Sequence, residues 1–357
     1  MRIGIDCRKA ADFGIGTYIR GLTHALADLP GDERYVLFAR ASSRHLLPSD
    51  ERFEIVEEDS PHYSVRELFA VGRQIRRKRL NLFHAPHYVV PVTDVATVVT
   101  IHDLIHLNQP RSGMLERPYA SWMISRAVHS SRTVLTVSSA VAAQISNRFP
   151  PAGKKIVVTP NGVGAAFTAA LEPSDETTLS RLGLSPGSYL LFVGNDKPHK
   201  NLPRLLEAFD TVRSALPDIG LVVAGSTPAA AQGRAGVSVT GFISDSELAA
   251  LYRGALLLVQ PSLEEGFGLP VLEAMASGTP ALVSKTDALT EVGGDAVETF
   301  DATSSEAMAR SITEIASDAG RRSAMIARGI SRAALFTWKC CAEKTLEVYR
   351  ASADVVR

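Results

Sequence analysis

Two carboxylates bracket a glycine-rich turn in the second half of the chain. Residues 261–280 read PSLEEGFGLPVLEAMASGTP, in which Glu265 and Glu273 stand on either side of GFGLP. Pro270 suits the first position of a helix, so the sequence predicts a helix that begins there with Glu273 in its first turn. Free amides and the helix dipole attract anions at such a place. Carboxylates around an anion site suit a ligand whose phosphates lie between hydroxyl-rich groups.

A lysine follows another strand pattern, in the segment VGNDKPHKNLPRLLEAF at 193–209. Asn201 is expected to cap the helix of this segment, and Pro203 fits its first turn. Lys200 precedes the cap and places a cation beside the helix amides, which is an arrangement for binding phosphate. Alone, Lys200 is as readily explained as a solvated surface lysine. Together with the first turn, it indicates that amides and Lys200 hold phosphate oxygens while the carboxylates accept hydrogen bonds from sugar hydroxyls.

Length and composition exclude several classes. A chain of 357 residues predicts roughly two domains of about 150 residues each. Lys plus Arg (38) equals Asp plus Glu (38), so no global basic field favours nucleic acid. The apolar runs are far shorter than the roughly 20 residues that span a bilayer, and MRIGID lacks the shape of a signal peptide. Three cysteines (Cys7, Cys340 and Cys341) make no disulfide framework or zinc site, which predicts reduced thiols in the cytoplasm.

Short β-branched runs alternate with amphipathic stretches in both halves. RIGID and TVVTIH are examples in the first half, and YLLFVG and LLLVQP in the second. Near-continuous apolar strands between helices predict parallel sheets covered on both faces. The expected fold is therefore α/β with two doubly wound domains, 1–165 and 166–336, joined by a linker within 164–188. Ligands of such sheets bind beyond the carboxyl ends of the strands.

Five segments carry a resemblance to a known family: EGFGLPVLEAMASGTP, VGNDKPHKNLPRLLEAF, TPNGV, GFISDSELAALY and GIGTYIRGL. They resemble retaining glycosyltransferases of family 4, and the resemblance covers nearly the whole chain. It implies the GT-B fold, in which two Rossmann-like domains face each other across a cleft and the C-terminal helix, about 337–357 here, packs back on the first domain. It also implies transfer of a hexose from a nucleotide diphosphate sugar to a hydroxyl acceptor, without cofactor or metal, and no Asp-x-Asp metal motif occurs at the site.

The resemblance also implies roles for individual residues. Glu265 would contact the donor sugar near the reacting centre, and Glu273 would bind the ribose hydroxyls. Lys200 would neutralise the departing diphosphate, and His102 would lie near the donor sugar. The remaining donor-binding positions would be Gly16, Asn195, Lys197, Gly241, Phe242, Gly266, Phe267, Gly268 and Leu269.

One position departs from the family pattern, and the acceptor side is less defined. Many members have an arginine where this chain has Asn195, with Lys197 as the nearby substitute cation. His84 and His87 are candidates for lining the acceptor pocket, or are ordinary loop histidines. Asp103 is placed to orient the preceding histidine and is counted with the acceptor side.

A basic run in the first half has two interpretations. It consists of Arg73, Arg76, Arg77, Lys78 and Arg79. Such a run is usually a solvated helix face. It also suits peripheral contact with an anionic membrane, which would place the protein at the inner face of the membrane and fit a lipid-linked acceptor.

Three other functions compete with glycosyl transfer. A dinucleotide-dependent oxidoreductase would need the full glycine fingerprint, and GIGTYIR has Arg20 in place of the third glycine. A sugar-nucleotide-binding protein without catalysis would not need Glu265, Lys200 and His102. A glycoside hydrolase would leave the phosphate-binding features unused. By family frequency the first choice of donor is GDP-mannose, followed by UDP-glucose and UDP-N-acetylglucosamine, and the acceptor is a glycan, a lipid-linked sugar or a small molecule.

Overall fold

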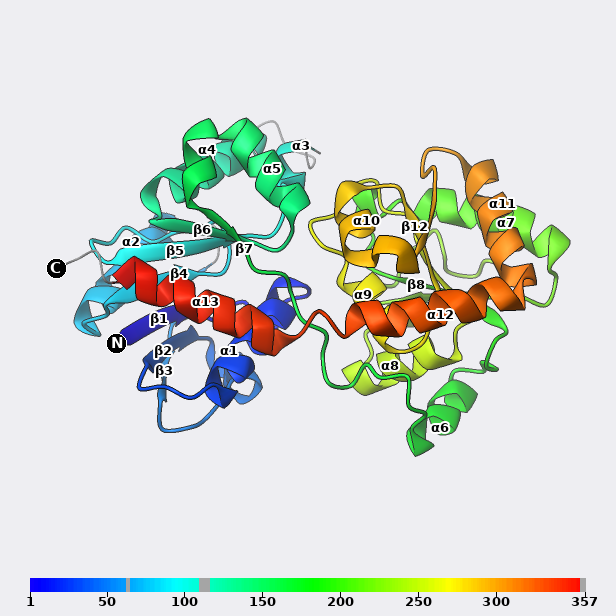
Figure 1. The fold of residues 1–357 in the computed structure, drawn as a ribbon, viewed down its shortest axis with the longest axis horizontal. Coiled ribbons are helices and arrows are strands. Elements are labelled where there is room, and N and C mark those ends of the chain that lie inside the picture. Colours follow the sequence, from blue (N-terminus) through cyan, green and yellow to red (C-terminus); the bar gives the residue numbers. More distant parts are fainter. Residues whose placement is uncertain (62–64, 109–115, 354–357) are drawn as a thin grey trace. The chain divides into compact units, whose positions relative to one another are not determined.

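The structure, a computed structural model, describes the chain except residues 62–64, 109–115 and 354–357. It divides into two compact units, residues 1–162 with 337–357, and residues 163–336. Each unit is a parallel sheet with helices on both faces (Figure 1). The predicted class, α/β with two doubly wound domains, is confirmed. Among the described residues, no helix has both the length and the hydropathy that spanning a bilayer requires.

The first unit contains a seven-stranded sheet in the order β3-β2-β1-β4-β5-β6-β7. The order reverses between β1 and β4, and the loops after these two strands are the usual ligand-binding place of a doubly wound sheet. The strands are β1 (Arg2–Asp6), β2 (Arg34–Ala39), β3 (Phe53–Glu57), β4 (Leu82–Ala85), β5 (Ala96–Ile101), β6 (Thr133–Thr136) and β7 (Ile156–Val158).

Helices cover both faces of this sheet. On β2, Tyr35 and Leu37 belong to the core cluster under α1 and α13, whereas Val36 and Phe38 belong to the cluster under α2, α4 and α5. A strand buried on both faces must be apolar at every position, which explains the uninterrupted run YVLFA. The helices are α1 (Ile15–Asp28), α2 (Val65–Arg77), α3 (Ile105–Asn108), α4 (Glu116–Ser130), α5 (Ser139–Arg148) and α13 (Trp338–Ala353), with 3₁₀ turns η1 (Ala41–Leu46) and η2 (Pro150–Lys155).

The second unit contains a six-stranded sheet in the order β10-β9-β8-β11-β12-β13, which reverses between β8 and β11. Its strands are β8 (Tyr189–Val193), β9 (Gly220–Ala224), β10 (Val237–Gly241), β11 (Leu257–Gln260), β12 (Ala281–Ser284) and β13 (Glu298–Phe300). Its helices are α6 (Pro173–Arg181), α7 (Leu202–Ala215), α8 (Asp245–Gly254), α9 (Leu269–Ala276), α10 (Asp287–Gly293), α11 (Ser305–Ser317) and α12 (Ala319–Ala333), with η3 (Pro198–Lys200) and η4 (Gly294–Ala296).

The chain passes between the units after Gly162 and returns before Thr337. A Cβ on Gly162 would lie 2.0 Å from the backbone nitrogen of Trp338, so the two passages approach each other more closely than any other residue type allows. From Trp338 onward, α13 packs on the first unit against α1, β4 and β5. The segment 164–188, expected to be a linker, instead holds α6 and belongs to the second unit.

Candidate active site

Lys200 and Glu265 form a buried ion pair in the second unit. Lys200 ends η3 in the loop after β8, and Glu265 lies in the loop after the neighbouring strand β11, so both stand where the strand order reverses. The Nζ of Lys200 donates a hydrogen bond to Oε1 of Glu265 at 2.6 Å. Their side chains are only 13% and 10% exposed. The two residues that the sequence assigned to phosphate and to sugar are therefore direct partners.

Two further donors meet the same oxygen of Glu265. Ser262 Oγ donates to Oε1 at 2.7 Å and Gln260 Nε2 donates to it at 3.2 Å. Burial alone would raise the pKa of Glu265, but the charge and hydrogen bond of Lys200 and the hydroxyl of Ser262 outweigh it, so this pKa lies below its ordinary value. Glu265 is thus a carboxylate, and its second oxygen, Oε2, is the one that can accept a hydrogen bond from a ligand.

The two loops are also bonded to each other. Asn201 was expected to cap α7, but its backbone is left-handed (φ 57°) and its side chain makes no cap hydrogen bond. Instead, Asn201 Nδ2 donates to the carbonyls of Pro261 at 3.1 Å and Ala302 at 2.9 Å. The amide of Leu263 donates to the carbonyl of His199 at 2.7 Å. These bonds fix the loop of Lys200 against the loop of Glu265 without any ligand.

Glu273 lies deeper than the sequence predicts. The helix α9 begins at Leu269, so Glu273 is past its first turn, which contains no acidic residue. The side chain is buried, and the hydroxyl of Tyr252 donates to its Oε2 at 3.0 Å. Burial raises the pKa of Glu273 to about 7, and the hydrogen bond from Tyr252 opposes this only in part. The second carboxyl group therefore keeps its proton to a much higher pH than an ordinary glutamate does.

Glycines shape the turn between the two carboxylates. Gly268 has φ 104°, and a Cβ there would lie 2.5 Å from the side chain of Leu289, so the position requires glycine. Gly266 and Phe267 are buried, and the ring of Phe267 packs on Phe336 with centroids 5.9 Å apart. Leu269 follows as the first residue of α9; Pro270 after it has no N–H, and the amides of Val271 and Leu272 donate to the carbonyl of Gly268 at 3.0 and 3.2 Å.

The other predicted donor-binding residues follow β8 and β10. Asn195 comes after β8, and its Oδ1 is buried without a hydrogen-bond partner among the described residues. Lys197 is exposed and precedes η3. Gly241 ends β10 with φ 67°, and Phe242 directly after it is 69% exposed. An aromatic ring at the carboxyl end of a strand offers a stacking surface to a ligand.

In the first unit, His102 directly follows β5. The Nε2 of its ring lies 2.9 Å from the carbonyl of Pro86, so Nε2 carries the proton and donates. Burial lowers the pKa of His102, against smaller opposing effects of the Pro86 carbonyl and of Asp103. Asp103 does not bond the ring; its Oδ1 accepts from the amide of Ile105 at 3.0 Å and holds the start of α3. The neutral ring therefore keeps a lone pair on Nδ1.

The expectation that His84 lines an acceptor pocket is wrong. His84 lies within β4 and is fully buried. Its Nδ1 lies 2.6 Å from the hydroxyl of Tyr349, and its Nε2 lies 2.7 Å from Oγ1 of Thr100. Burial lowers the pKa of His84 to about 3, so the ring is neutral. It is a core histidine because a strand covered on both faces leaves no side of His84 open.

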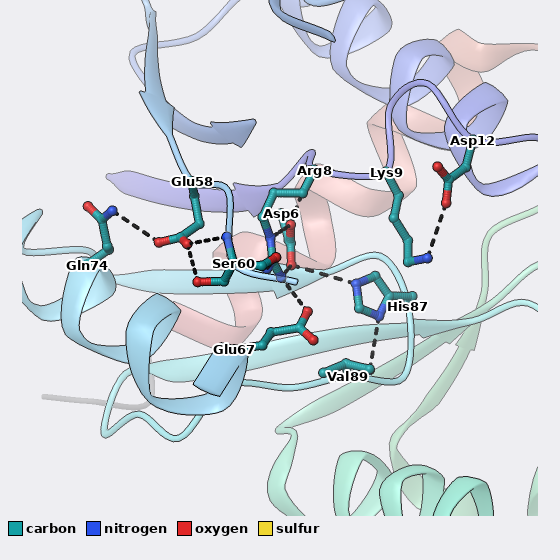
Figure 2. Close-up of polar contacts among 10 residues, drawn as sticks. All are labelled: Asp6, Arg8, Lys9, Asp12, Glu58, Ser60, Glu67, Gln74, His87 and Val89. Atoms are coloured by element: carbon teal, nitrogen blue, oxygen red, sulfur yellow. Dashed lines mark hydrogen bonds and ion pairs between the residues drawn. The ribbon is translucent and has the colours of Figure 1, made fainter. Parts of the chain in front are cut away.

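His87 is also buried, in a polar cluster at the strand reversal of the first unit (Figure 2). Arg8 Nη2 donates to Asp6 Oδ2 at 2.5 Å and to Glu67 Oε1 at 2.6 Å. The Nδ1 of His87 accepts from the amide of Val89 at 3.1 Å, and its Nε2 lies 3.7 Å from Asp6. Burial alone would raise the pKa of Asp6, but the charge and hydrogen bonds of Arg8 hold it far below its ordinary value.

This cluster resembles a metal site in composition only. One ligand atom each of Asp6, Glu67 and His87 lies within 4.8 Å of the others. Arg8, however, already supplies a cation to both carboxylates with charge-assisted hydrogen bonds. The guanidinium thus stands where a metal ion would otherwise be needed, and the buried ring of His87 lies beside Asp6.

Gly16 does not present its amide as expected. It is buried in α1, its N–H donates to the carbonyl of Phe13 at 3.3 Å, and a Cβ would lie 2.7 Å from the carbonyl of Ala10. The glycine is needed for close packing of its own loop. Gly14, with φ 47° and open space around it, is the exposed glycine that precedes α1.

Comparison with known proteins places this site in a family. The model described as Glycosyltransferase Family 4 matches residues 14–167, and the model described as Glycosyl transferases group 1 matches residues 181–332. The chain belongs to the family 4 glycosyltransferases with the GT-B fold. The oxidoreductase, hydrolase and non-catalytic hypotheses are therefore set aside.

Individual relatives agree with the family. The O-antigen chain mannosyltransferase B of Escherichia coli is 28% identical over 288 residues, covering 75% of this chain and 74% of that protein. A D-inositol 3-phosphate glycosyltransferase of Arthrobacter is 26% identical over 96% of this chain and 90% of its own length. Some other curated relatives are matched over only about half of their length. The structure of a sucrose-phosphate synthase from Thermosynechococcus elongatus has the same fold, with TM-score 0.79, 20% identity and 98% of both chains covered.

Several residues of the glycosyltransferase escaped the sequence interpretation. Ser262 and Gln260 bond Glu265, and Tyr252 bonds Glu273. For Ser262 and Gln260, the available signal was the sequence QPS at the end of an apolar run. It places polar side chains at the carboxyl end of that strand. No local signal marks Tyr252, which lies on α8, twenty-one residues before its partner.

The raised pKa of Glu273 predicts a pH-dependent stability. Its folded pKa of about 7 exceeds the ordinary 4.5, so the folded protein holds the proton more tightly than the unfolded chain. The contribution is complete below pH 4.5 and is lost as pH rises through 7, by on the order of 3 kcal/mol. The Glu273→Gln variant should therefore be more stable than the parent at pH 8. At pH 5 this advantage in stability should be much smaller.

Thermal unfolding of both proteins at pH 5 and pH 8 measures this effect. Glu207→Gln, at an exposed position on α7, provides the control and should change stability equally at the two pH values. A Glu273→Gln stability difference that is the same at both pH values would contradict the raised pKa.

Proposed function

We propose that this glycosyltransferase transfers a hexose from a nucleotide diphosphate sugar to an acceptor hydroxyl with retention of the anomeric configuration. The observation that carries the proposal is the Lys200–Glu265 pair at the strand reversal of the second unit, with Glu273 at the other end of the same glycine-rich turn. A cation, a helix N-terminus and two carboxylates around one turn suit a sugar, a diphosphate and a ribose in one ligand.

Lys200 is suited to the diphosphate because its contact with Glu265 uses one of three N–H donors. The ammonium can keep this bond and donate to a phosphate oxygen as well. The N-terminus of α9, which begins at Leu269, adds the positive end of a helix dipole. Preorganised positive charge of this kind stabilises the departing diphosphate more than the intact donor, and this difference accelerates the reaction.

The carboxylates serve the neutral parts of the donor in this proposal. Glu265 offers Oε2 to a hydroxyl of the transferred sugar, and its negative charge favours the positive charge that develops at the anomeric carbon. Glu273 accepts hydrogen bonds from the ribose, and the ring of Phe242 stacks on the base. Three donors hold Oε1 of Glu265, so this carboxylate is suited to stabilise charge. In the proposed reaction, the departing phosphate takes the proton of the acceptor hydroxyl on the same face of the sugar.

The proposed donor is GDP-mannose, with UDP-glucose and UDP-N-acetylglucosamine as the next candidates. Support comes from the relatives named O-antigen chain mannosyltransferase, of which one matches three quarters of this chain. The same names favour a glycan or lipid-linked sugar as the acceptor. A panel of GDP- and UDP-sugars in thermal-shift assays, followed by product analysis with the donor that stabilises the protein most, tests this choice.

Peripheral membrane contact is a second part of the proposal, and one face of α2 supports it. Phe69, Arg73, Arg76 and Arg77 follow helical spacing and are all exposed, with Phe69 at 57%. The acidic residue in the first turn of α2 is Glu67, which is buried against Arg8. Lys78 belongs less to this face than expected because it pairs with Glu54 at 2.5 Å. The outward face is cationic and aromatic, as at a lipid interface.

Substitutions of Lys200 and of Glu265 should have different effects on nucleoside diphosphate affinity but similar effects on turnover. Lys200→Met should weaken binding of nucleoside diphosphate and lower turnover by roughly 10²-fold or more, because it removes the phosphate cation and leaves Glu265 buried without a counter-charge. Glu265→Gln should lower turnover by a similar factor while nucleoside diphosphate affinity stays nearly intact, because its role lies at the transferred sugar.

Calorimetric titration with GDP and UDP, beside initial rates with the preferred donor, separates the two effects. Lys339→Met, at a lysine 74% exposed on α13, is the matched charge-removal control and should change neither quantity. Unchanged diphosphate affinity in Lys200→Met, or equal loss of affinity in both variants, would show that the assignment of roles is wrong.

Catalysis should not depend on a metal ion, because Lys200 and helix amides supply the positive charge for the leaving group. Initial rates after incubation with excess EDTA should equal those of untreated enzyme. Loss of activity that manganese or magnesium restores would refute this part of the proposal.

Vesicle binding should depend on the outward face of α2. The full chain should sediment with vesicles that contain phosphatidylglycerol and less with pure phosphatidylcholine, and high salt should weaken the binding because it screens the charges. Replacing Arg73, Arg76 and Arg77 by serine should remove most of it. As a control, three exposed arginines elsewhere are replaced by serine: Arg148, Arg310 and Arg328. This variant has the same net charge and should keep its vesicle binding. Equal loss in both triple variants would exclude a defined membrane face.

A further inference from the structure

Four buried side chains connect the C-terminal helix α13 to the helix α1 through the core of the first unit. The hydroxyl of Tyr349 on α13 lies 2.6 Å from Nδ1 of His84, and Nε2 of His84 lies 2.7 Å from Oγ1 of Thr100. Thr100 Oγ1 in turn lies 3.0 Å from the hydroxyl of Tyr18 on α1. All four residues are fully buried, and these bonds give each ring nitrogen and each hydroxyl a partner. A buried network in which all members are satisfied is rigid.

Tyr18 is also in contact with His102. The two rings meet edge to face, with centroids 4.8 Å apart at 78°. On its other side, His102 is held by the bond from Nε2 to the carbonyl of Pro86. Two contacts of different kinds thus fix the plane of the imidazole and leave Nδ1 as the nitrogen with the lone pair.

The start of α13 reaches Tyr18 directly. The ring of Trp338 lies edge-on to the ring of Tyr18, with centroids 6.2 Å apart. Trp338 fills the space above Gly21 of α1, where a Cβ would come within 2.2 Å of the indole. Its backbone nitrogen packs on Gly162, at the place where the chain leaves the first unit. Tyr18 is therefore in contact with Trp338 at the start of α13 and is connected to Tyr349, nearer its end, through Thr100 and His84.

We propose that Tyr18 is a positioning residue, which orients the imidazole of His102 and makes that orientation depend on the seating of α13. The inference rests on the proposed function and on the place near the donor sugar that the family resemblance implies for His102. Tyr18 touches no substrate in this proposal; it acts by restricting a ring that must meet the transferred sugar in one orientation. Misplacement of a reacting or supporting group by about 1 Å is enough to lower a rate by up to 10²-fold.

Two substitutions of Tyr18 separate the ring from the hydroxyl. Tyr18→Leu removes the edge contact, and kcat should fall between about 10- and 100-fold while affinity for nucleoside diphosphate, which binds in the second unit, is unchanged. Tyr18→Phe keeps the ring and should restore most of the activity. In ¹⁵N-correlated spectra of the imidazole, His102 should be a single Nε2–H tautomer in the parent and in Tyr18→Phe, and a mixture in Tyr18→Leu.

A matched substitution controls for loss of packing. Tyr35 is equally buried in the same core cluster and stacks on Phe53 with centroids 4.7 Å apart, on the far strands β2 and β3. Tyr35→Leu should lower the thermal stability to a comparable extent without the change in kcat or in the His102 spectrum. Equal effects of Tyr35→Leu and Tyr18→Leu on kcat, or an unaltered His102 tautomer in Tyr18→Leu, would overturn the proposal.

Tyr349→Phe tests the link to α13 and removes only one buried hydroxyl. It deprives His84 of its Nδ1 partner, and it should lower kcat severalfold and shift the His102 resonances. If neither changes, the dependence on α13 is wrong. His102→Ala distinguishes failure of the proposed role of His102 from failure of the role of Tyr18. Full activity of His102→Ala would refute the place of His102 at the reacting sugar. The tautomer measurement on Tyr18→Leu would still decide whether Tyr18 orients the ring.

Discussion

The buried pair of Lys200 and Glu265 connects the two loops at the strand reversal of the second unit, and the proposed site is arranged around it. Removing two charges from water is unfavourable, and replacement of such a pair by apolar residues is often neutral or stabilising in other proteins. Here the pair is surrounded by bonds that fix its loops, from Asn201 to Pro261 and from Leu263 to His199. A charge pair held in place by the backbone of two neighbouring strand ends is better explained by a ligand that needs it than by the stability of the fold.

The first unit has a charged cluster at the equivalent place in its sheet, but with a different outcome. Arg8 donates to two carboxylates at once, through Nε and Nη2, and the three side chains are almost fully buried, with Glu67 contributed by α2. Lys200 donates to one carboxylate and, as an ammonium, has two further donors. At the strand reversal of the first sheet, the cation therefore bonds two carboxylates. At the strand reversal of the second sheet, the cation bonds one carboxylate and keeps donors for a further partner. This contrast supports the proposal that the donor diphosphate binds to the second unit.

The sequence predicted best what depends on neighbouring residues. Near-continuous apolar runs between amphipathic stretches predicted both sheets, and turn patterns placed Lys200 and Glu265 each in a loop before a helix. Single residues were misplaced where distant contacts decide. Asn201 adopts a left-handed backbone because its amide bonds carbonyls 60 and 101 positions away. His84 looked like a loop residue, yet it belongs to a strand buried on both faces. Arg8 meets Glu67 across 59 positions, which no local pattern reveals.

The two carboxylates can flank an anion site because their environments move their pKa values in opposite directions. Burial acts on both, but only Glu265 has a cation beside it, so its charge is cancelled by Lys200. Glu273 has a neutral phenol as its partner, and its pKa of about 7 leaves it only partly charged in the free protein. In the proposed function, a diphosphate that binds between them would therefore meet the ammonium of Lys200 and the N-terminus of α9 rather than two full negative charges. Ribose hydroxyls that donate to Glu273 would favour its ionised form, so nucleotide binding and release of a proton from Glu273 become coupled.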